Sequence, residues 1–252
     1  RWDALGVVQR EMGGRALFPW FRTPHLDRIA SEGARFANVF VTTSLCSPGR
    51  ASLLSGRYAR RHKVLNNFTE YPNDLPGYPS QLRAAGYETA YIGKWHMGED
   101  NDEQRPGFDF WMSHRGQGNY FDNTFNVNGT RKQYPGYYTT TITEAAVQWI
   151  GQPHPKPWLL IVGQKAPHGG PIQPEPQFEH ALDSFPVTKP RNFEDYRPAD
   201  GKPAWLEESY PTWHGAGGPL YGLKEYDKFV RAYLATLLSV DESVGCIYAA
   251  LK

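Results

Sequence analysis

Apolar segments of strand length alternate with helical patterns along much of this chain. Three segments have the apolar, β-branched and aromatic composition of short strands: 36–42, 87–93 and 158–162. A helical pattern precedes each of them, at 23–33, 79–85 and 143–150. Because a helical crossover brings consecutive strands into a parallel arrangement, this order predicts an α/β fold with a largely parallel central sheet flanked by helices.

The composition favours one folded domain without a nucleic-acid or membrane partner. Of 252 residues, 40% are hydrophobic and 21% are charged, so the chain can build a core. The formal net charge of +1 provides no overall field that would attract nucleic acid. No apolar run approaches the roughly 20 residues of a membrane span, and the first residues lack the pattern of a signal peptide. We therefore expect neither nucleic-acid binding nor a membrane span.

The last third of the sequence divides into an irregular stretch and a helix. Residues 171–219 are rich in proline, glycine and aromatic residues and have no clear period, which favours a long surface excursion. Residues 224–251 place apolar side chains at alternating steps of three and four. This spacing predicts an amphipathic helix that faces the core.

The stretch around Cys46 carries the strongest chemical signal. Ser47 is a candidate N-cap, Pro48 suits a first helical turn, and Gly56 suits the end of a helix. Cys46 would then precede a helix N-terminus, where the helix dipole lowers a thiol pKa, with Arg50 about one turn further on. A buried structural cysteine is the alternative. A cysteine phosphatase loop fits less well, because it separates Cys and Arg by five residues and this chain separates them by three.

Cys46-Ser47-Pro48-Gly49-Arg50, followed by residues 53–57, resembles the first signature of the type I sulfatases, in the alkaline phosphatase superfamily. Gly49 and Ser55 depart from the commoner residues of that signature. Residues 86–96 resemble the second signature, and Ala166-Pro167-His168 resembles a later segment that carries an active-site histidine. The resemblance implies that a formylglycine-generating enzyme converts Cys46 to formylglycine.

The resemblance also implies the roles of the site residues. The hydrated aldehyde at position 46 would attack the sulfur of a sulfate ester, and Arg50 would hold that hydrate. Lys94 would bind sulfate oxygens, and either His96 or His168 would protonate the leaving alcohol. Such cationic groups and a proton donor suit an ester whose leaving oxygen gains negative charge.

The family uses one Ca²⁺ in each active site, with the formylglycine at position 46 as one of its ligands. Its remaining ligands would lie outside this chain. Residues 1–252 would therefore be part of a single sulfatase catalytic domain with an alkaline-phosphatase-like fold. That part would lack the first metal-binding strand and everything after the helix at 224–251, which leaves activity of this chain alone open.

Three segments lean toward carbohydrate sulfatases that act on glycosaminoglycans, including N-acetylglucosamine-6-sulfate: 64–67, 125–129 and 237–241. Asn67 is a candidate for contact with a sugar hydroxyl, and Trp95 is a candidate for stacking on a sugar, with hydrophobic packing as its alternative. Two other functions stay open, a phosphate or phosphonate monoester hydrolase of the same superfamily and a non-catalytic glycan-binding fragment. A sulfatase of this kind would be secreted or periplasmic, or lysosomal in a eukaryote.

Overall fold

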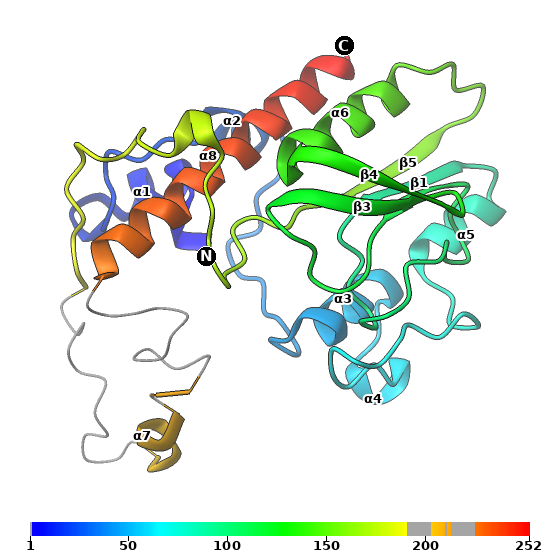
Figure 1. The fold of residues 1–252 in the computed structure, drawn as a ribbon, viewed down its shortest axis with the longest axis horizontal. Coiled ribbons are helices and arrows are strands. Elements are labelled where there is room, and N and C mark those ends of the chain that lie inside the picture. Colours follow the sequence, from blue (N-terminus) through cyan, green and yellow to red (C-terminus); the bar gives the residue numbers. More distant parts are fainter. Residues whose placement is uncertain (1, 191–202, 210, 213–224) are drawn as a thin grey trace. The chain divides into compact units, whose positions relative to one another are not determined.

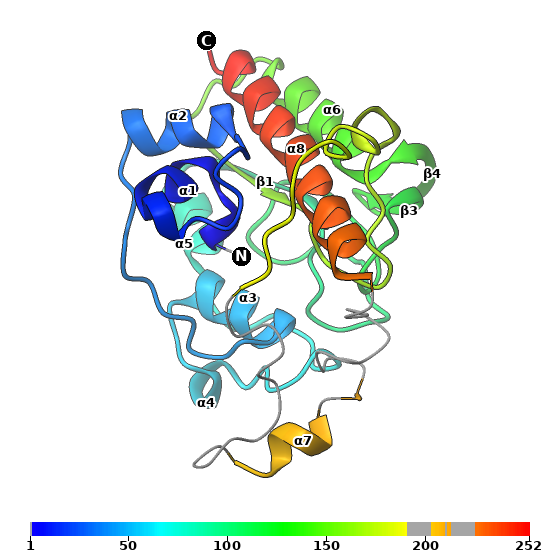
Figure 2. The same ribbon diagram turned by 90° about the vertical axis from the view of Figure 1, so that its left-hand side faces the viewer.

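The computed structural model describes residues 2–190, 203–209, 211–212 and 225–252 (Figures 1 and 2). The chain divides into two compact units. The first comprises Arg1–Arg35 and Ala166–Gly245, and the second comprises Phe36–Lys165 and Cys246–Lys252. Each unit is described by itself below. That the whole chain is part of a single catalytic domain stays a prediction.

The second unit is built on a five-stranded sheet with the order β4-β3-β2-β1-β5. Its strands are β1 (Glu88–Gly93), β2 (Phe110–Ser113), β3 (Phe121–Val127), β4 (Thr130–Tyr137) and β5 (Trp158–Gly163). β1 is parallel to both β2 and β5, whereas β3 is antiparallel to β2 and to β4. The sheet is therefore mixed, with a parallel part formed by β2, β1 and β5.

Alternate side chains of these parallel strands enter two cores on opposite faces of the sheet, as the two-residue period of a strand requires. On one face, Tyr91 of β1 and Trp111 of β2 pack with Ala51 and Leu54. On the other face, Ile92 of β1 packs with residues of α6 (Tyr138–Ile150), which lies along the sheet in Figure 1. The parallel strands are thus covered on both faces, so a site on them would lie at the ends of the strands.

Several predicted elements are confirmed with small shifts of their ends. The strand at 87–93 is β1, and the strand at 158–162 is β5. The helix at 79–85 is α5 (Tyr78–Ala84), and the helix that begins near Cys46 is α3 (Cys46–Ser55), followed by α4 (Ala59–His62). The helix at 143–150 is α6, which starts five residues earlier, at Tyr138.

The strand expected at 36–42 is wrong. These residues form neither helix nor strand, and Phe36, Val39 and Phe40 are 79%, 73% and 87% exposed. A strand forms only beside a hydrogen-bonded partner, and none of the five strands of the described sheet pairs with this segment. The alternating sequence alone therefore does not make it a strand.

The first unit packs α1 (Gly6–Met12) and α2 (Pro24–Glu32) against α8 (Tyr226–Ala250), as Figure 2 shows. α2 and α8 confirm the helices predicted at 23–33 and 224–251. Its short helices are η1 (Trp2–Ala4), η2 (Gly13–Arg15), η3 (Pro176–Phe178) and α7 (Trp205–Ser209). The buried core includes Ala4, Phe21, Leu182, Val230, Leu234, Ala235 and Leu237. The apolar stripe of α8 thus faces a core, as its spacing predicts.

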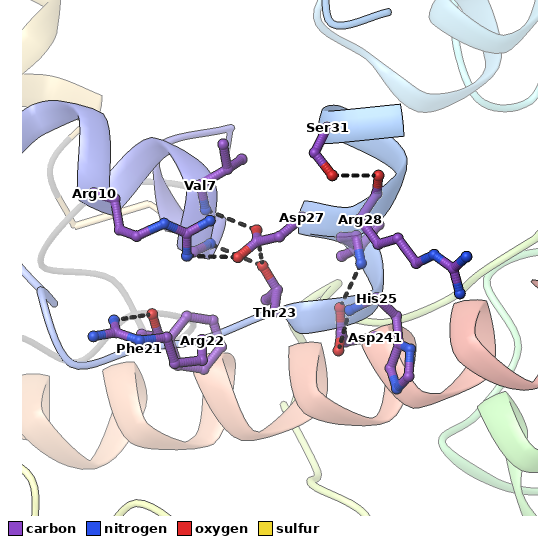
Figure 3. A network of polar contacts seen from close by, with 12 residues as sticks. Val7, Arg10, Phe21, Arg22, Thr23, His25, Asp27, Arg28, Ser31 and Asp241 are labelled. Atoms are coloured by element: carbon purple, nitrogen blue, oxygen red, sulfur yellow. Dashed lines mark hydrogen bonds and ion pairs between the residues drawn. The ribbon is translucent and has the colours of Figure 1, made fainter. Parts of the chain in front are cut away.

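A buried carboxylate, Asp241, and a half-buried one, Asp27, join these helices (Figure 3). Asp241 of α8 accepts hydrogen bonds from the backbone N–H groups of His25, at 3.2 Å, and Leu26, at 2.8 Å. Asp27 of α2 accepts one from the N–H of Val7, at 2.7 Å. Two backbone donors at the start of α2, which would otherwise lack acceptors, are therefore satisfied by a neighbouring helix.

The surface excursion predicted at 171–219 falls partly outside the described residues, since 191–202, 210 and 213–219 are not among them. The described part of it contains η3 and α7. A separate finding concerns membranes. Among the helices of the described residues, none is both long enough and apolar enough to cross a bilayer.

Candidate active site

The carboxyl ends of three parallel strands in the second unit carry the candidate site. Lys94 follows β1 directly, His96 lies two residues further on, and Lys165 follows β5 after one intervening residue. The loop after β2 carries Gln117. Because β1, β2 and β5 are parallel, these ends lie at the same edge of the sheet, which is where open α/β sheets bind their ligands.

A close approach of two strands fixes where Lys94 leaves the sheet. Gly93, the last residue of β1, is paired with Gly163 of β5 and has a φ of 107°. A Cβ atom on Gly93 would lie 2.3 Å from the carbonyl oxygen of Gly163. The backbone N–H of Lys94 donates to that same oxygen, at 2.8 Å. Only glycine fits at position 93, so this residue helps to set where the backbone of Lys94 lies.

Helix α3 begins at Cys46 itself, with Leu45 at the N-cap position, so the prediction that Ser47 is the N-cap is wrong. Ser47 is buried inside the first turn, and its Oγ donates to the carbonyl oxygen of His96, at 2.7 Å. Its backbone N–H donates to Oδ1 of Asn67, at 3.1 Å. The Ser47 side chain thus ties the start of the helix to the loop after β1. The predicted end is confirmed, because Gly56 is the left-handed C-cap.

Arg50 lies one turn into α3 and reaches the end of β1. Its Nη1 donates to the carbonyl oxygen of Lys94, at 2.6 Å, and to the hydroxyl oxygen of Tyr91, at 3.4 Å. The same helix therefore carries Cys46 at its first residue and a cation that holds the backbone of Lys94.

The ammonium group of Lys94 is enclosed, because the residue is only 2% exposed. Its Nζ donates to Oε1 of Gln117. Burial and the neighbouring positive charges of Arg50 and Lys165 lower the pKa of Lys94 to about 7, while nearby Cys46 and Glu99 oppose that change. An anion in this place would favour the charged form of Lys94, because it would replace the hydration that burial removes.

Cys46 is a free, half-buried cysteine whose ionisation responds to these neighbours. Its pKa falls to about 7, and the side chain of His96 is the largest cause. The positive charge of Lys94 and the side chain of Gln117 lower the pKa further, whereas burial raises it. Position 46 therefore lies in surroundings that stabilise negative charge.

His96 is held in an uncommon conformation beside Cys46. Its φ is 47°, in the left-handed region that non-glycine residues rarely adopt. Residues in such uncommon backbone conformations cluster at functional sites. Nε2 donates to Oε1 of Glu99, at 2.8 Å. The other nitrogen, Nδ1, is buried and has no hydrogen-bond partner among the residues that the structure describes. The hydrogen bond to Glu99 thus fixes the orientation of the imidazole ring. Nδ1 is left to accept a proton or a hydrogen bond from a group at the site.

A neutral histidine supports the loop that carries Gln117. Burial lowers the pKa of His114 to about 4, and its Nδ1 donates to the carbonyl oxygen of Arg115, at 3.0 Å. Nε2 then accepts from the hydroxyl of Tyr138, at 2.8 Å. Gly118 has a φ of 65°, and a Cβ atom there would lie 2.6 Å from the His114 ring. The loop therefore packs directly on this imidazole.

Four residues of this arrangement were not predicted: Glu99, His114, Gln117 and Lys165. Lys165 is buried, and its Nζ lies 4.9 Å from the centre of the Tyr120 ring. For Lys165 a sequence signal exists, since it lies shortly after the predicted strand at 158–162 and directly precedes Ala166-Pro167-His168. Gln117 has a weaker signal, as a polar residue between two glycines just after an apolar segment.

The structure brings Cys46, Arg50, Lys94 and His96 together in the second unit, whereas His168 belongs to the first. Nδ1 of His168 donates to the carbonyl oxygen of Gly169, at 2.9 Å. A role of Trp95 in stacking on a sugar is wrong. Trp95 is 3% exposed and is enclosed by other aromatic rings, so it offers no face to a ligand.

The described residues do not make a calcium site by themselves. Within that part of the chain, no group of three or more His, Cys, Asp or Glu side chains is arranged to hold a metal ion. Oxygen-rich coordination of Ca²⁺ requires several converging carboxylates or carbonyls. The described residues by themselves therefore do not fit the ion.

Comparison with known proteins identifies the family. The family model for sulfatases matches residues 14–252, which is nearly the whole chain. The chain belongs to the sulfatase family. Its mixed sheet flanked by helices is that of alkaline-phosphatase-like sulfatase structures, so the predicted α/β class and family are confirmed.

Individual relatives cover the chain well but are longer than it is. N-acetylglucosamine-6-O-sulfatase of Bacteroides thetaiotaomicron is 29% identical over 89% of this chain and 49% of its own length. The extracellular sulfatase SULF-1 homolog of Drosophila melanogaster is 27% identical over 96% of this chain and 22% of its own length. A solved structure in complex with its substrate, D-glucosamine-2-N,6-O-disulfate, is 26% identical with a TM-score of 0.79, over 99% of this chain and 59% of that one. The chain spans about half the length, or less, of these curated relatives.

Proposed function

We propose that the protein containing this chain hydrolyses sulfate esters of carbohydrates, with Cys46 matured to formylglycine. The observation that carries the proposal is the position of Cys46, half-buried at the first residue of α3 among groups that stabilise negative charge. Formylglycine at this position supplies a hydrated aldehyde whose hydroxyl group is the nucleophile. Cys46 fits this group because it is a free cysteine beside cationic and hydrogen-bonding side chains. A formylglycine-generating enzyme is the partner that this maturation requires.

The residues around position 46 divide the remaining work. Lys94 binds the sulfate oxygens. Its ammonium group is buried away from water, so a bound anion would stabilise its positive charge. Arg50 holds the backbone of Lys94 and stabilises the hydrate. His96 exchanges a proton through Nδ1, with Glu99 fixing the ring. His168 is the other candidate for protonation of the leaving alcohol.

The substrate we propose is a glycosaminoglycan-type sugar with a 6-O-sulfate, as in N-acetylglucosamine-6-sulfate. Support comes from the name of the Bacteroides relative and from the disulfated glucosamine bound in the similar structure. Asn67 is proposed to contact the sugar. The support is a single contact: its Oδ1 accepts a hydrogen bond from the backbone N–H of Ser47, the residue after Cys46, at 3.1 Å.

We also propose that the protein acts outside the cytoplasm. Sulfated glycans are found there, and the Drosophila relative is named an extracellular sulfatase. We therefore propose that the protein is exported from the cytoplasm. Its destination would be the extracellular space, the periplasm or, in a eukaryote, the lysosome. The calcium ion of the family would require ligands beyond those in the described residues.

The test compares sulfate and phosphate esters on the protein at its natural length, produced in a host that forms formylglycine. We expect release of sulfate from N-acetylglucosamine-6-sulfate and little turnover of the matching 6-phosphate. Cys46→Ala abolishes turnover. Cys246→Ala is the matched control and leaves turnover unchanged, because Cys246 is exposed and outside the site.

Two results would overturn the proposal. Faster turnover of the phosphate ester would identify a phosphoryl hydrolase of the same superfamily. Binding of the sulfated sugar without turnover, in protein whose Cys46 is shown to be mature, would identify a glycan-binding protein.

A further inference from the structure

Lys165 is a buried cation to which the proposed function gives no role. It is 6% exposed, and its Nζ lies 4.9 Å from the centre of the Tyr120 ring. Burial lowers the pKa of its ammonium group, and no carboxylate among the described residues opposes this. Within the same part of the chain, Nζ has neither an ion pair nor a hydrogen-bond acceptor. Because a buried ammonium group without a counter-ion is costly, an anion bound there would stabilise it.

The tip of the Lys165 side chain is open to a ligand. Its Nζ is not among the described side-chain atoms that are both sealed from water and without a hydrogen-bond partner. Since this atom lacks a partner, part of its surface must be in contact with solvent. The residue is thus buried along its stem, while its charged end remains accessible.

Lys165 and Lys94 follow neighbouring strands. β1 and β5 are parallel and paired as far as Gly93 and Gly163. The backbone N–H of Lys94 donates to the carbonyl oxygen of Gly163, which lies two residues before Lys165. Burial and the charge of Arg50 lower the pKa of Lys94, and the charge of Lys165 lowers it further. The two lysines are therefore close enough for their charges to interact.

The loop after β2 contacts both ammonium groups. Oε1 of Gln117 accepts the hydrogen bond from Nζ of Lys94, and the ring of Tyr120 lies beside Nζ of Lys165. Gln117 and Tyr120 are three residues apart, so their Cα atoms are separated by at most about 11 Å. Both side chains thus reach the same short stretch of chain from the same edge of the sheet.

Little negative charge compensates these lysines within the described residues. Cys46 and Glu99 are the negative groups that act on Lys94. Oε1 of Glu99 is already bonded to His96, at 2.8 Å. Conversion of Cys46 to formylglycine replaces its thiolate with an uncharged aldehyde. The mature site would therefore have an excess of positive charge beside position 46, which favours an anionic ligand.

We propose that Lys165 is a further anion-binding residue of the active site, and that its Nζ donates a hydrogen bond to the same sulfate group that Lys94 binds. This inference rests on the proposed function, which places the sulfate group at Lys94. The oxygens of a sulfate group point in different directions, so two ammonium groups can donate to it at once. A sulfate between them would also offset the repulsion between their charges.

The first test is a calorimetric titration of the natural-length protein with inorganic sulfate, after maturation of Cys46 has been shown by mass spectrometry. Lys165→Met keeps the length of the side chain and removes its charge. We expect this variant to bind sulfate about 10- to 100-fold more weakly, because one charged hydrogen bond is lost. Lys165→Arg should recover part of the affinity. Lys132→Met, at an exposed position on β4, is the matched control and should bind sulfate as the wild type does.

The Tm separates anion binding from a structural role. Without sulfate, Lys165→Met should be at least as stable as the wild type, because it removes a buried charge that has no partner. Added sulfate should raise the Tm of the wild type more than that of the variant. A lower Tm of the variant by the same amount with and without sulfate would overturn the proposal, as would wild-type affinity for sulfate in Lys165→Met.

A crystal structure of the natural-length protein with sulfate tests the contact without any variant. We expect Nζ of Lys94 and Nζ of Lys165 to lie within hydrogen-bond distance of one sulfate ion. A sulfate that contacts Lys94 and not Lys165 would overturn the inference. The titration requires no turnover, so the two proposals can fail separately. Weaker sulfate binding by Lys165→Met, beside a wild type that hydrolyses no sulfate ester, would support the anion site and overturn the proposed function.

Discussion

Arg50 of helix α3 donates a hydrogen bond to the carbonyl oxygen of Lys94, which links the helix of Cys46 to the end of strand β1 at 2.6 Å. We predict that Arg50→Lys lowers kcat/KM for a sulfate ester by about 100-fold, because one ammonium group cannot reproduce the planar set of donors. Steady-state kinetics measure this. Arg60→Lys, an exposed position on α4, should change little.

Maturation must be measured beside that variant, because Arg50 belongs to the motif around Cys46. A mass spectrum of the peptide should show formylglycine in both proteins before their rates are compared. Turnover at the wild-type rate by mature Arg50→Lys protein would contradict the role given to this arginine.

Gln117 accepts the hydrogen bond of the Lys94 ammonium group, and this defines a second prediction. Gln117→Leu removes the acceptor and leaves a buried charge less well satisfied, so kcat/KM should fall by about 10- to 100-fold. Gln133→Leu is the control, because Gln133 lies on β4 and bonds to Thr124 at an exposed position. Equal losses in both variants would show that Gln117 acts only through general stability.

Glu99 orients His96, so Glu99→Gln should lower kcat by about tenfold or more with a smaller change in KM. The amide is nearly the same size as the carboxylate, and it holds the ring without a negative charge. Glu103→Gln is the matched control in the same loop region, at an exposed site. An unchanged kcat in Glu99→Gln would mean that the fixed ring of His96 is not required.

Asp241 supports the first unit by accepting two backbone hydrogen bonds at the start of α2 (Figure 3). Asp241→Ala should lower the free energy of unfolding by about 1–2 kcal/mol, because both donors lose their acceptor. Urea denaturation followed by tryptophan fluorescence measures the change. The neighbouring exposed position provides the control, and Glu242→Ala should change stability by less than about 0.5 kcal/mol.

The same carboxyl group makes stability depend on pH. Burial raises the pKa of Asp241, and the N–H groups of Leu26 and His25 only partly oppose this. A raised pKa in the folded state favours the protonated form, so this contribution to stability is complete below the usual pKa of about 4. It is lost as the pH rises through the raised value. The difference in unfolding free energy between wild type and Asp241→Asn should therefore decrease over that range, and a constant difference would contradict the assignment.

Sequence patterns predicted the elements whose apolar residues follow a clear local pattern. The strands β1 and β5 are continuous apolar segments, and the helix α8 has apolar residues at helical spacing. The segment at 36–42 has a similar pattern but no strand beside it, so a partner decides its structure. The hairpin of β3 and β4 was not predicted, although Asn128-Gly129 at its turn is a typical hairpin signal.

The site divides in the same way. The motifs predicted Cys46, Arg50, Lys94 and His96, and these lie in one unit. Gln117 and Glu99 reach the site through the loop after β2 and the turn after His96, which a pattern of residue types does not reveal. The prediction that Trp95 stacks on a sugar was wrong. The sequence does not show whether the ring of a tryptophan between two site residues is exposed to a ligand or packed in the core.

The chemical state of residue 46 decides the central claim most directly. We predict that a mass spectrum of the peptide containing Cys46, from protein made in its native host, shows an aldehyde at that position in the fraction that releases sulfate. An unmodified thiol in fully active protein would contradict the claim, since the nucleophile would then be the cysteine itself.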